Sequence, residues 1–156
     1  MTSWDGLFAC FCCLIGIGLA FTQETHAQTP ANPLGGFLWK NRLVIIVSEE
    51  ATDELIQAQL EVQAQYMLEW KDRDLIWLWV SNSGGLDQLG QEYSPEACQV
   101  IQKKYDLGHH PSQVILVGKD GGRKMQKFSS PFTSQELFRV IDRMPMRRQE
   151  MQTGKP

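Results

Sequence analysis

VILVGKDGG, residues 114–122, is the stretch that decides the fold. Its first four residues are apolar and mostly β-branched, which predicts a buried strand. The Gly-Lys-Asp-Gly-Gly that follows predicts a tight reversal, because Asp-Gly tolerates the positive φ that hairpin turns require. Residues 123–128 then return as the partner strand, so the two segments together predict an antiparallel hairpin.

A helix is expected directly after this hairpin. Thr133 and Glu136 have the spacing of a capping box, in which the threonine oxygen accepts the amide of the residue three positions on and the glutamate reaches back. Pro145 ends the helical pattern. The apolar stripe of this helix is formed by Leu137, Phe138, Ile141 and Met144.

The first half of the chain predicts a β-α-β unit. Residues 43–48 (LVIIVS) form an apolar run that is typical of a central strand with both faces covered, and residues 75–80 (LIWLWV) form the second strand. Thr52 is placed to cap a helix between them that runs to about Trp70. A helix between two buried strands implies parallel pairing with a right-handed crossover. The expected apolar stripe of this helix is Ile56, Leu60, Ala64, Met67 and Trp70.

The segment between this unit and the hairpin contains a loop and a helix. Residues 81–93 (SNSGGLDQLGQEY) are expected to form a flexible loop. Ser94 and Pro95 then start a helix, with serine as the cap and proline in the first turn, where its missing amide costs nothing. The helix carries Cys98 and is expected to end near Lys104.

The order of these elements, β-α-β-α-β-β-α, defines the predicted fold class. It is the order of an α/β domain of the thioredoxin-like type, with a four-stranded mixed sheet and helices on both faces. The prediction requires that the two parallel strands lie beside each other and that the hairpin lies on the other side of the first strand.

Four stretches of the chain carry a resemblance to a known family. They are NPLGGFLWKNRLVIIV (32–47), KDRDLIWLWV (71–80), VILVGKDGGRK (114–124) and ELFRVIDRMPMRRQE (136–150). In these stretches the chain resembles the bacterial domain-of-unknown-function family allied to the P-DUDES domains of animal extracellular-matrix proteins. The resemblance implies a thioredoxin-like fold, export from the cytoplasm and no assigned enzymatic activity. Because the animal relatives belong to proteins of matrix binding and cell adhesion, it also implies a binding module by analogy.

The amino-terminal region predicts an export signal. Residues 7–21 (LFACFCCLIGIGLAF) form an apolar run with the length of a signal-peptide core, short of the roughly 18 to 20 residues of a membrane span. Cleavage after Ala27 makes 1–27 the signal peptide, and an uncleaved amino-terminal anchor is the alternative. The mature protein is then periplasmic or extracellular, and the signal segment is the only part of the chain expected to contact a membrane.

The remaining chain divides into three parts. Residues 28–36 are expected to form a linker, 37–145 the thioredoxin-like domain, and 146–156 a basic carboxyl-terminal tail. The net charge of −3 gives no reason to expect nucleic acid as a partner, and no motif implies a cofactor. Acids dominate residues 49–96 and bases dominate the chain from residue 97 onward, which leaves a possible docking surface.

Cysteine placement argues against thioredoxin chemistry. Redox thioredoxins carry a thiol at the start of the first helix, where the dipole lowers its pKa. Here residues 48–53 read SEEATD, and Gln113, not proline, precedes the hairpin's first strand. Cys98 is the only thiol of the predicted mature chain. It favours a buried apolar role, and a single-cysteine peroxidase is the alternative, with Lys103 and Lys104 near in sequence.

A metal site is a further enzyme or ligand hypothesis. In a thioredoxin-like fold the loop before the hairpin faces the start of the first helix, which brings His109 and His110 towards Glu49 and Glu50. Imidazole and carboxylate together suit zinc or another divalent ion. The alternative is a solvated loop beside a helix start whose acids match the helix dipole.

The basic tail region supplies the predicted binding surface. Arg143, Arg147 and Arg148 surround a Met-Pro-Met segment and could hold an acidic protein or another anionic surface. Equally, these arginines could pair with the acidic first half of the domain and pin the carboxyl terminus. The sequence therefore favours an exported, redox-inactive binding or adhesion module. The alternative is a cell-envelope enzyme that uses Cys98 or a bound metal.

Overall fold

A computed structural model describes residues 32–154. The predicted signal peptide, and the linker up to residue 31, lie outside the described residues. The elements in chain order are η1 (Gly35–Phe37), β1 (Arg42–Val47), α1 (Glu54–Gln65), α2 (Met67–Asp72), β2 (Leu75–Val80), β3 (Gly85–Asp87), β4 (Glu92–Tyr93), α3 (Pro95–Tyr105), β5 (Gln113–Val117), β6 (Arg123–Phe128), α4 (Ser134–Asp142) and α5 (Pro145–Thr153).

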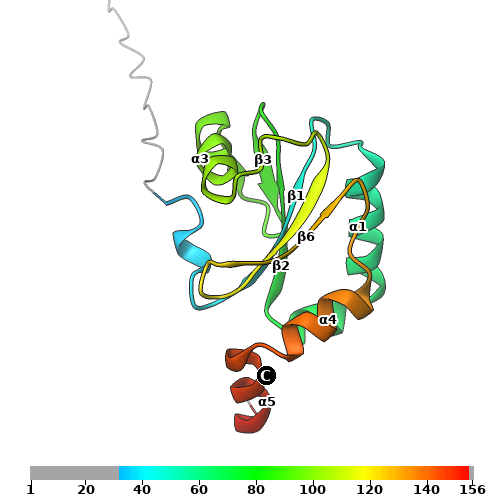
Figure 1. Cartoon of the computed structure of the whole chain (residues 1–156), viewed down its shortest axis with the longest axis vertical. Helices are drawn as coiled ribbons and strands as arrows, with labels where there is room; N and C mark the ends of the chain where they lie inside the picture. The colour runs from blue at the N-terminus through cyan, green and yellow to red at the C-terminus, as the bar shows by residue number, and fades with distance from the viewer. Residues whose placement is uncertain (1–31, 155–156) are drawn as a thin grey trace, which may run out of the picture.

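One mixed sheet organises the domain, with the strand order β4-β3-β2-β1-β5-β6 (Figure 1). β1 and β2 are parallel, with Ile45 opposite Leu78. β5 lies antiparallel on the other side of β1, and β6 pairs antiparallel with β5. The predicted parallel pair, the hairpin and the position of the hairpin beside the first strand are therefore confirmed.

The four-stranded sheet of the prediction was wrong, because the sheet has six strands. The two additional strands, β3 and β4, lie in the segment expected to be a flexible loop. β3 pairs antiparallel with β2, with Trp79 opposite Leu86. Strands this short show no alternation of apolar and polar residues, and their pairing depends on the backbone, so the sequence pattern did not reveal them.

Helices cover both faces of the sheet, as predicted (Figure 1). On one face, Ile45, Leu78 and Ile115 pack with residues of α3, including Cys98 and Ile101. The other face packs against α1, α2 and α4, through buried residues that include Val44, Ile56, Trp70, Leu116, Leu137 and Ile141. Trp77 and Trp79 are partly buried against this second core. Burial of these two cores provides the main stabilisation of the fold.

The first predicted helix is two helices that meet at Tyr66. The cap is Asp53, whose carboxylate accepts the amide of Leu55 at 2.8 Å, and not Thr52. Tyr66 has φ −121° and ψ 36°, which interrupts the helix. Of the predicted stripe, Ile56 and Trp70 are buried and Leu60 is partly buried, whereas Ala64 and Met67, on either side of this break, are exposed, so their predicted burial was wrong.

The later helices begin where the sequence predicted. Ser94 caps α3 with Pro95 in the first turn, and Thr133 and Glu136 form the capping box of α4. Pro145 ends the stripe of α4 and also begins α5, so much of the predicted tail is helical. Within residues 32–154, no helix is long and apolar enough to cross a membrane.

Candidate functional site

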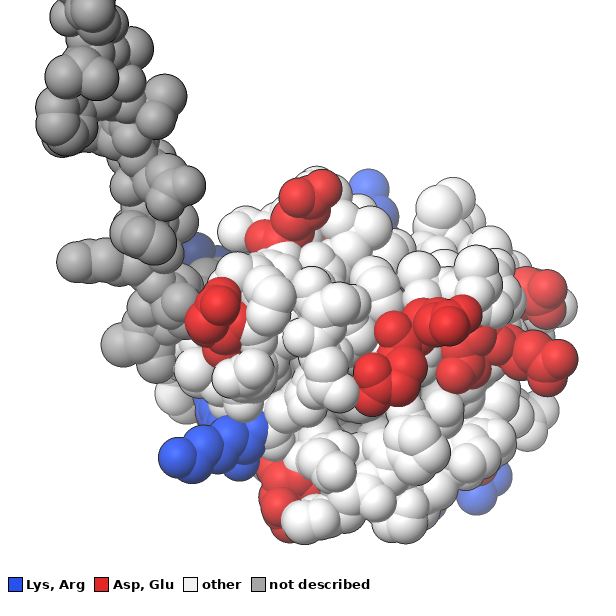
Figure 2. Space-filling view, turned by 90° about the horizontal axis from the view of Figure 1, so that it is seen from above, with Lys and Arg blue, Asp and Glu red and all other residues white. Residues whose placement is uncertain are grey.

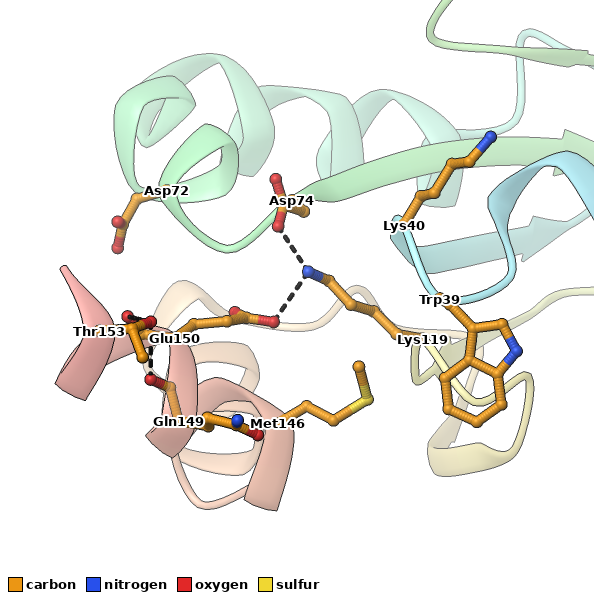
Figure 3. A pocket seen from close by; sticks show the side chains of 9 residues that line it. All are labelled: Trp39, Lys40, Asp72, Asp74, Lys119, Met146, Gln149, Glu150 and Thr153. Atoms are coloured by element: carbon orange, nitrogen blue, oxygen red, sulfur yellow. Dashed lines mark hydrogen bonds and ion pairs between the residues drawn. The ribbon is translucent and has the colours of Figure 1, made fainter. Parts of the chain in front are cut away.

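A cavity of about 470 Å³ lies between the segment that follows η1, the hairpin turn and α5, at the amino ends of β1 and β2 (Figure 3). We call it the Trp39 cavity. Its volume falls within the roughly 300 to 1,000 Å³ that small-ligand sites occupy. The lining residues are Trp39, Lys40, Asp72, Asp74, Lys119, Met146, Gln149, Glu150 and Thr153.

Trp39 is presented to solvent from a strained backbone. Its side chain is 66% exposed, and its φ is 64°, a left-handed conformation that is unusual for a bulky residue. The Trp39 amide donates to the carbonyl oxygen of Lys119 at 2.7 Å, which fixes this geometry against the hairpin turn. Asp74, which also lines the cavity, has a φ of 48°. Positive φ values at residues other than glycine cluster at functional sites, where the surrounding structure holds them in place.

The floor of the cavity is an ion-pair network centred on Lys119 and Glu150. Lys119 is only 9% exposed, and its Nζ lies 2.6 Å from Asp74 Oδ2 and 2.8 Å from Glu150 Oε1 (Figure 3). Arg42, which is 1% exposed, donates to both carboxylate oxygens of Glu150 at 3.2 and 3.1 Å. Burial alone would raise the pKa of Glu150, but the hydrogen bonds from Arg42 and Lys119 together lower it. Glu150 is thus a carboxylate at neutral pH, fixed by two cations.

Arg147 anchors α5 beside this network. It is 4% exposed, its guanidinium donates to the carbonyl oxygen and the carboxylate of Asp72, and its Nε lies 3.5 Å from Asp142 Oδ1. Asp142 also receives two hydrogen bonds from Arg73. Arg147 therefore pairs with the acidic first half of the domain, which is the structural alternative that the sequence allowed.

The other two predicted binding arginines are placed differently. Arg143 is the C-cap residue of α4 and Arg148 lies in α5, and both side chains are exposed. An anionic partner for these two residues stays a prediction.

The residues predicted to bind metal lie at the opposite end of the sheet. His109, His110 and Glu49 line one cavity of about 320 Å³, and Glu49 and Glu50 line a neighbouring cavity with Asp53. Figure 2 views the molecule from above Figure 1 and shows acidic side chains gathered on part of this face.

The histidines have other contacts. His109 Nε2 lies 3.0 Å from Asp106 Oδ1, and the ring of His110 lies 4.2 Å from that of Phe128. Over residues 32–154, no three His, Cys, Asp or Glu side chains are grouped closely enough to hold a metal ion.

Cys98 lies in the core between α3 and the sheet and has no exposed surface. Burial raises the pKa of its thiol, and a backbone hydrogen bond with Ser81 only partly offsets this effect. A thiol in this setting has little thiolate at neutral pH and no access to a substrate.

The residues that form the Trp39 cavity are not evident from the sequence pattern. Trp39 and Lys119 lie in two of the stretches that carry the family resemblance, 32–47 and 114–124, but Trp39 stands at the start of the predicted domain and Lys119 in the predicted turn. The available signal for Lys119 is a lysine that follows the apolar run of residues 114–117 after a single glycine, Gly118. No sequence signal shows that Glu150, 31 positions later, would lie against it.

Comparison with protein families identifies the group to which the chain belongs. Residues 33–150 match the family described as Domain of unknown function (DUF4174). Because the match spans more than half of the chain, the protein belongs to this family. A search of curated proteins finds no match.

Proposed function

We propose that the chain is an exported, redox-inactive binding module of the thioredoxin-like type, and that the Trp39 cavity is its ligand site. Two parallel strands flanked by an antiparallel hairpin, with helices on both faces, support the thioredoxin-like assignment. The resemblance to the P-DUDES domains of animal matrix proteins supports a binding role by analogy, and the apolar run at residues 7–21 supports export.

The residues at the usual thioredoxin reaction centre support a role without redox chemistry. The segment that leads into α1 carries Glu49, Glu50 and Asp53, and such acids would raise the pKa of a thiol placed there. Cys98, the thiol of the described residues, is enclosed in the core.

The observation that carries the proposal is the strained, exposed Trp39 above a rigid, charge-compensated floor. An indole left mostly in water contributes little to folding, and a left-handed backbone costs an ordinary residue roughly 1 to 2 kcal/mol. Glycine would occupy this position with less strain. A tryptophan held there despite both costs is typical of a residue retained for binding.

The test is a screen of a chemically diverse fragment library against the full chain labelled with ¹⁵N. We expect fragments to shift the indole N–H signal of Trp39 together with amides of Lys119 and α5. Trp39→Gly should abolish the shifts of the Lys119 and α5 amides while leaving the domain at least as stable as wild type. Leu89→Ala, which removes another exposed apolar side chain that does not line the cavity, serves as the matched control.

Two outcomes would overturn the proposal. One is a screen whose hits map elsewhere or do not occur. The other is a Trp39→Gly domain that unfolds at markedly lower denaturant concentration, because this would show that the indole serves stability.

A further inference from the structure

The charges of the Trp39 cavity are largely compensated inside the protein. Asp74 and Glu150 pair with Lys119, Glu150 pairs with Arg42, and Asp72 pairs with Arg147. Within the described part of the chain, Lys40 is the lining residue whose charge has no ion-pair partner. A strongly anionic ligand would meet three carboxylates and a cationic ligand would meet two lysines, so the site favours a ligand without net charge.

Several lining groups retain hydrogen-bonding capacity. A carboxylate offers about four acceptor positions, and the ion pairs of Asp72 and Asp74 use their Oδ2 atoms. Among residues 32–154, no side-chain hydrogen bond reaches the Oδ1 atom of either aspartate, the side-chain amide of Gln149 or the Nζ of Lys40. These groups can together accept from and donate to several hydroxyls of one ligand.

The indole of Trp39 and the carboxylate of Asp72 lie at opposite ends of the cavity (Figure 3). In Figure 3 the indole of Trp39 lies at one end, Asp72 and Thr153 lie at the other, and Lys119 and the thioether of Met146 lie between them. A ligand that fits this arrangement has one flat apolar face to stack on the indole and polar groups around its edge.

These features define a ligand class. We infer that the Trp39 cavity binds a neutral sugar, with a pyranose ring stacked on Trp39 and hydroxyls of the sugar bonded to Asp74 and Gln149. The C–H face of a pyranose supplies the apolar surface, and its hydroxyls both donate and accept. An extended peptide is a poorer fit, because peptides recognised by strand addition need a free sheet edge, whereas this cavity lies at the ends of central strands.

The inference rests on the proposed function and is tested by titrating the full chain with cellobiose, maltose and N,N′-diacetylchitobiose. Choline and citrate serve as charged probes of similar or smaller size. We expect at least one of the three sugars to shift the Trp39 indole signal saturably. Trp39→Ala should weaken that affinity at least tenfold and Gln149→Ala severalfold, while Leu89→Ala leaves it unchanged.

Retention on insoluble cellulose or chitin distinguishes a polymer from a free sugar as the source of the ligand. Retention that Trp39→Ala abolishes indicates a polymer, and binding of the disaccharides alone indicates a soluble sugar. The inference is overturned if none of the three sugars shifts the cavity signals. In that case, binding of choline, citrate or library fragments at the cavity would still support a binding module with a different ligand. If no probe binds at the cavity, both the sugar inference and the proposed function are wrong.

Discussion

Glu150→Gln is expected to destabilise the domain strongly, because Glu150 joins α5 to the amino end of the sheet. The substitution keeps the size of the side chain and removes the charge that faces Arg42 and Lys119. Breaking a buried ion pair in this way costs about 3 to 5 kcal/mol, because the remaining charge stays buried without compensation. In the variant, Arg42 still donates a hydrogen bond to the carbonyl oxygen of Arg73, and Lys119 still forms its ion pair with Asp74. We therefore expect a loss of unfolding free energy at the lower end of this range, about 3 kcal/mol.

Equilibrium unfolding in urea, followed by tryptophan fluorescence, measures this loss. With a slope of about 2 kcal/mol per molar urea, the midpoint should fall by about 1.5 M. Hydrogen exchange adds a local readout, since the amides of α5 should lose protection more than those of β1. Arg148→Gln removes an exposed charge from the same helix and should change stability by less than about 0.5 kcal/mol.

The pH dependence provides an independent check on the same carboxylate. Because the pKa of Glu150 is lowered in the folded state, its ionised form stabilises the domain above the unfolded pKa, and this contribution is lost as the pH falls through the folded pKa. The stability difference between wild type and Glu150→Gln should therefore be constant above about pH 5 and shrink on acidification. A difference below about 0.5 kcal/mol at neutral pH, or one that does not change down to about pH 3, would refute the reasoning.

Three further predictions concern the core and the helix starts. Cys98 should react with an aromatic disulfide reagent only after the domain is unfolded, and rapid labelling of the native protein would contradict its enclosure in the core. Gly85→Ala should cost about 1 to 3 kcal/mol in urea unfolding, because the new Cβ would lie 2.5 Å from the Trp79 carbonyl oxygen and 3.0 Å from the sulfur of Cys98. Gly36→Ala, whose Cβ meets nothing within 4 Å, is the matched control, and equal effects would show that the close contact is unimportant. Thr133→Ala should lower the free energy of unfolding, measured by thermal denaturation, by about 1 kcal/mol, because the α4 capping box is lost. Ser130→Ala, just outside the helix, should leave this free energy unchanged.

The parts of the fold that the sequence predicted are those with a strong local signal. The apolar strand and Asp-Gly turn of residues 114–122 indicated the hairpin, and the Thr133 and Glu136 spacing indicated the start of α4. β3 and β4 gave no such signal, because their pairing uses backbone groups of very short segments. The break at Tyr66 was also hidden, since its residues have ordinary helix propensities and tertiary packing decides the backbone there.

The candidate site was less predictable than the fold, because its residues come from distant segments. Lys119 contacts Asp74, 45 positions earlier, and Glu150, 31 positions later. No periodic pattern encodes such contacts. The sequence indicates Arg143, Arg147 and Arg148 as a binding surface because charge near Met and Pro is a local feature, whereas the structure buries Arg147 in an ion pair with Asp72.

On the proposed thioredoxin-like scaffold, the Trp39 cavity, our proposed ligand site, lies at the end of the sheet opposite the acidic segment that leads into α1. In open α/β sheets, ligands commonly bind at the carboxyl ends of the parallel strands, and here that end carries exposed acids without a thiol. At the amino ends, η1, the hairpin turn and α5 form walls that the central strands alone do not provide. Because Glu150 supplies the floor and also fixes α5, docking of α5 and formation of the cavity are one event. A ligand that spans Trp39 and Gln149 must therefore stabilise the docked helix by the free energy of its binding, so ligand-dependent protection of α5 amides would report occupancy of the site directly.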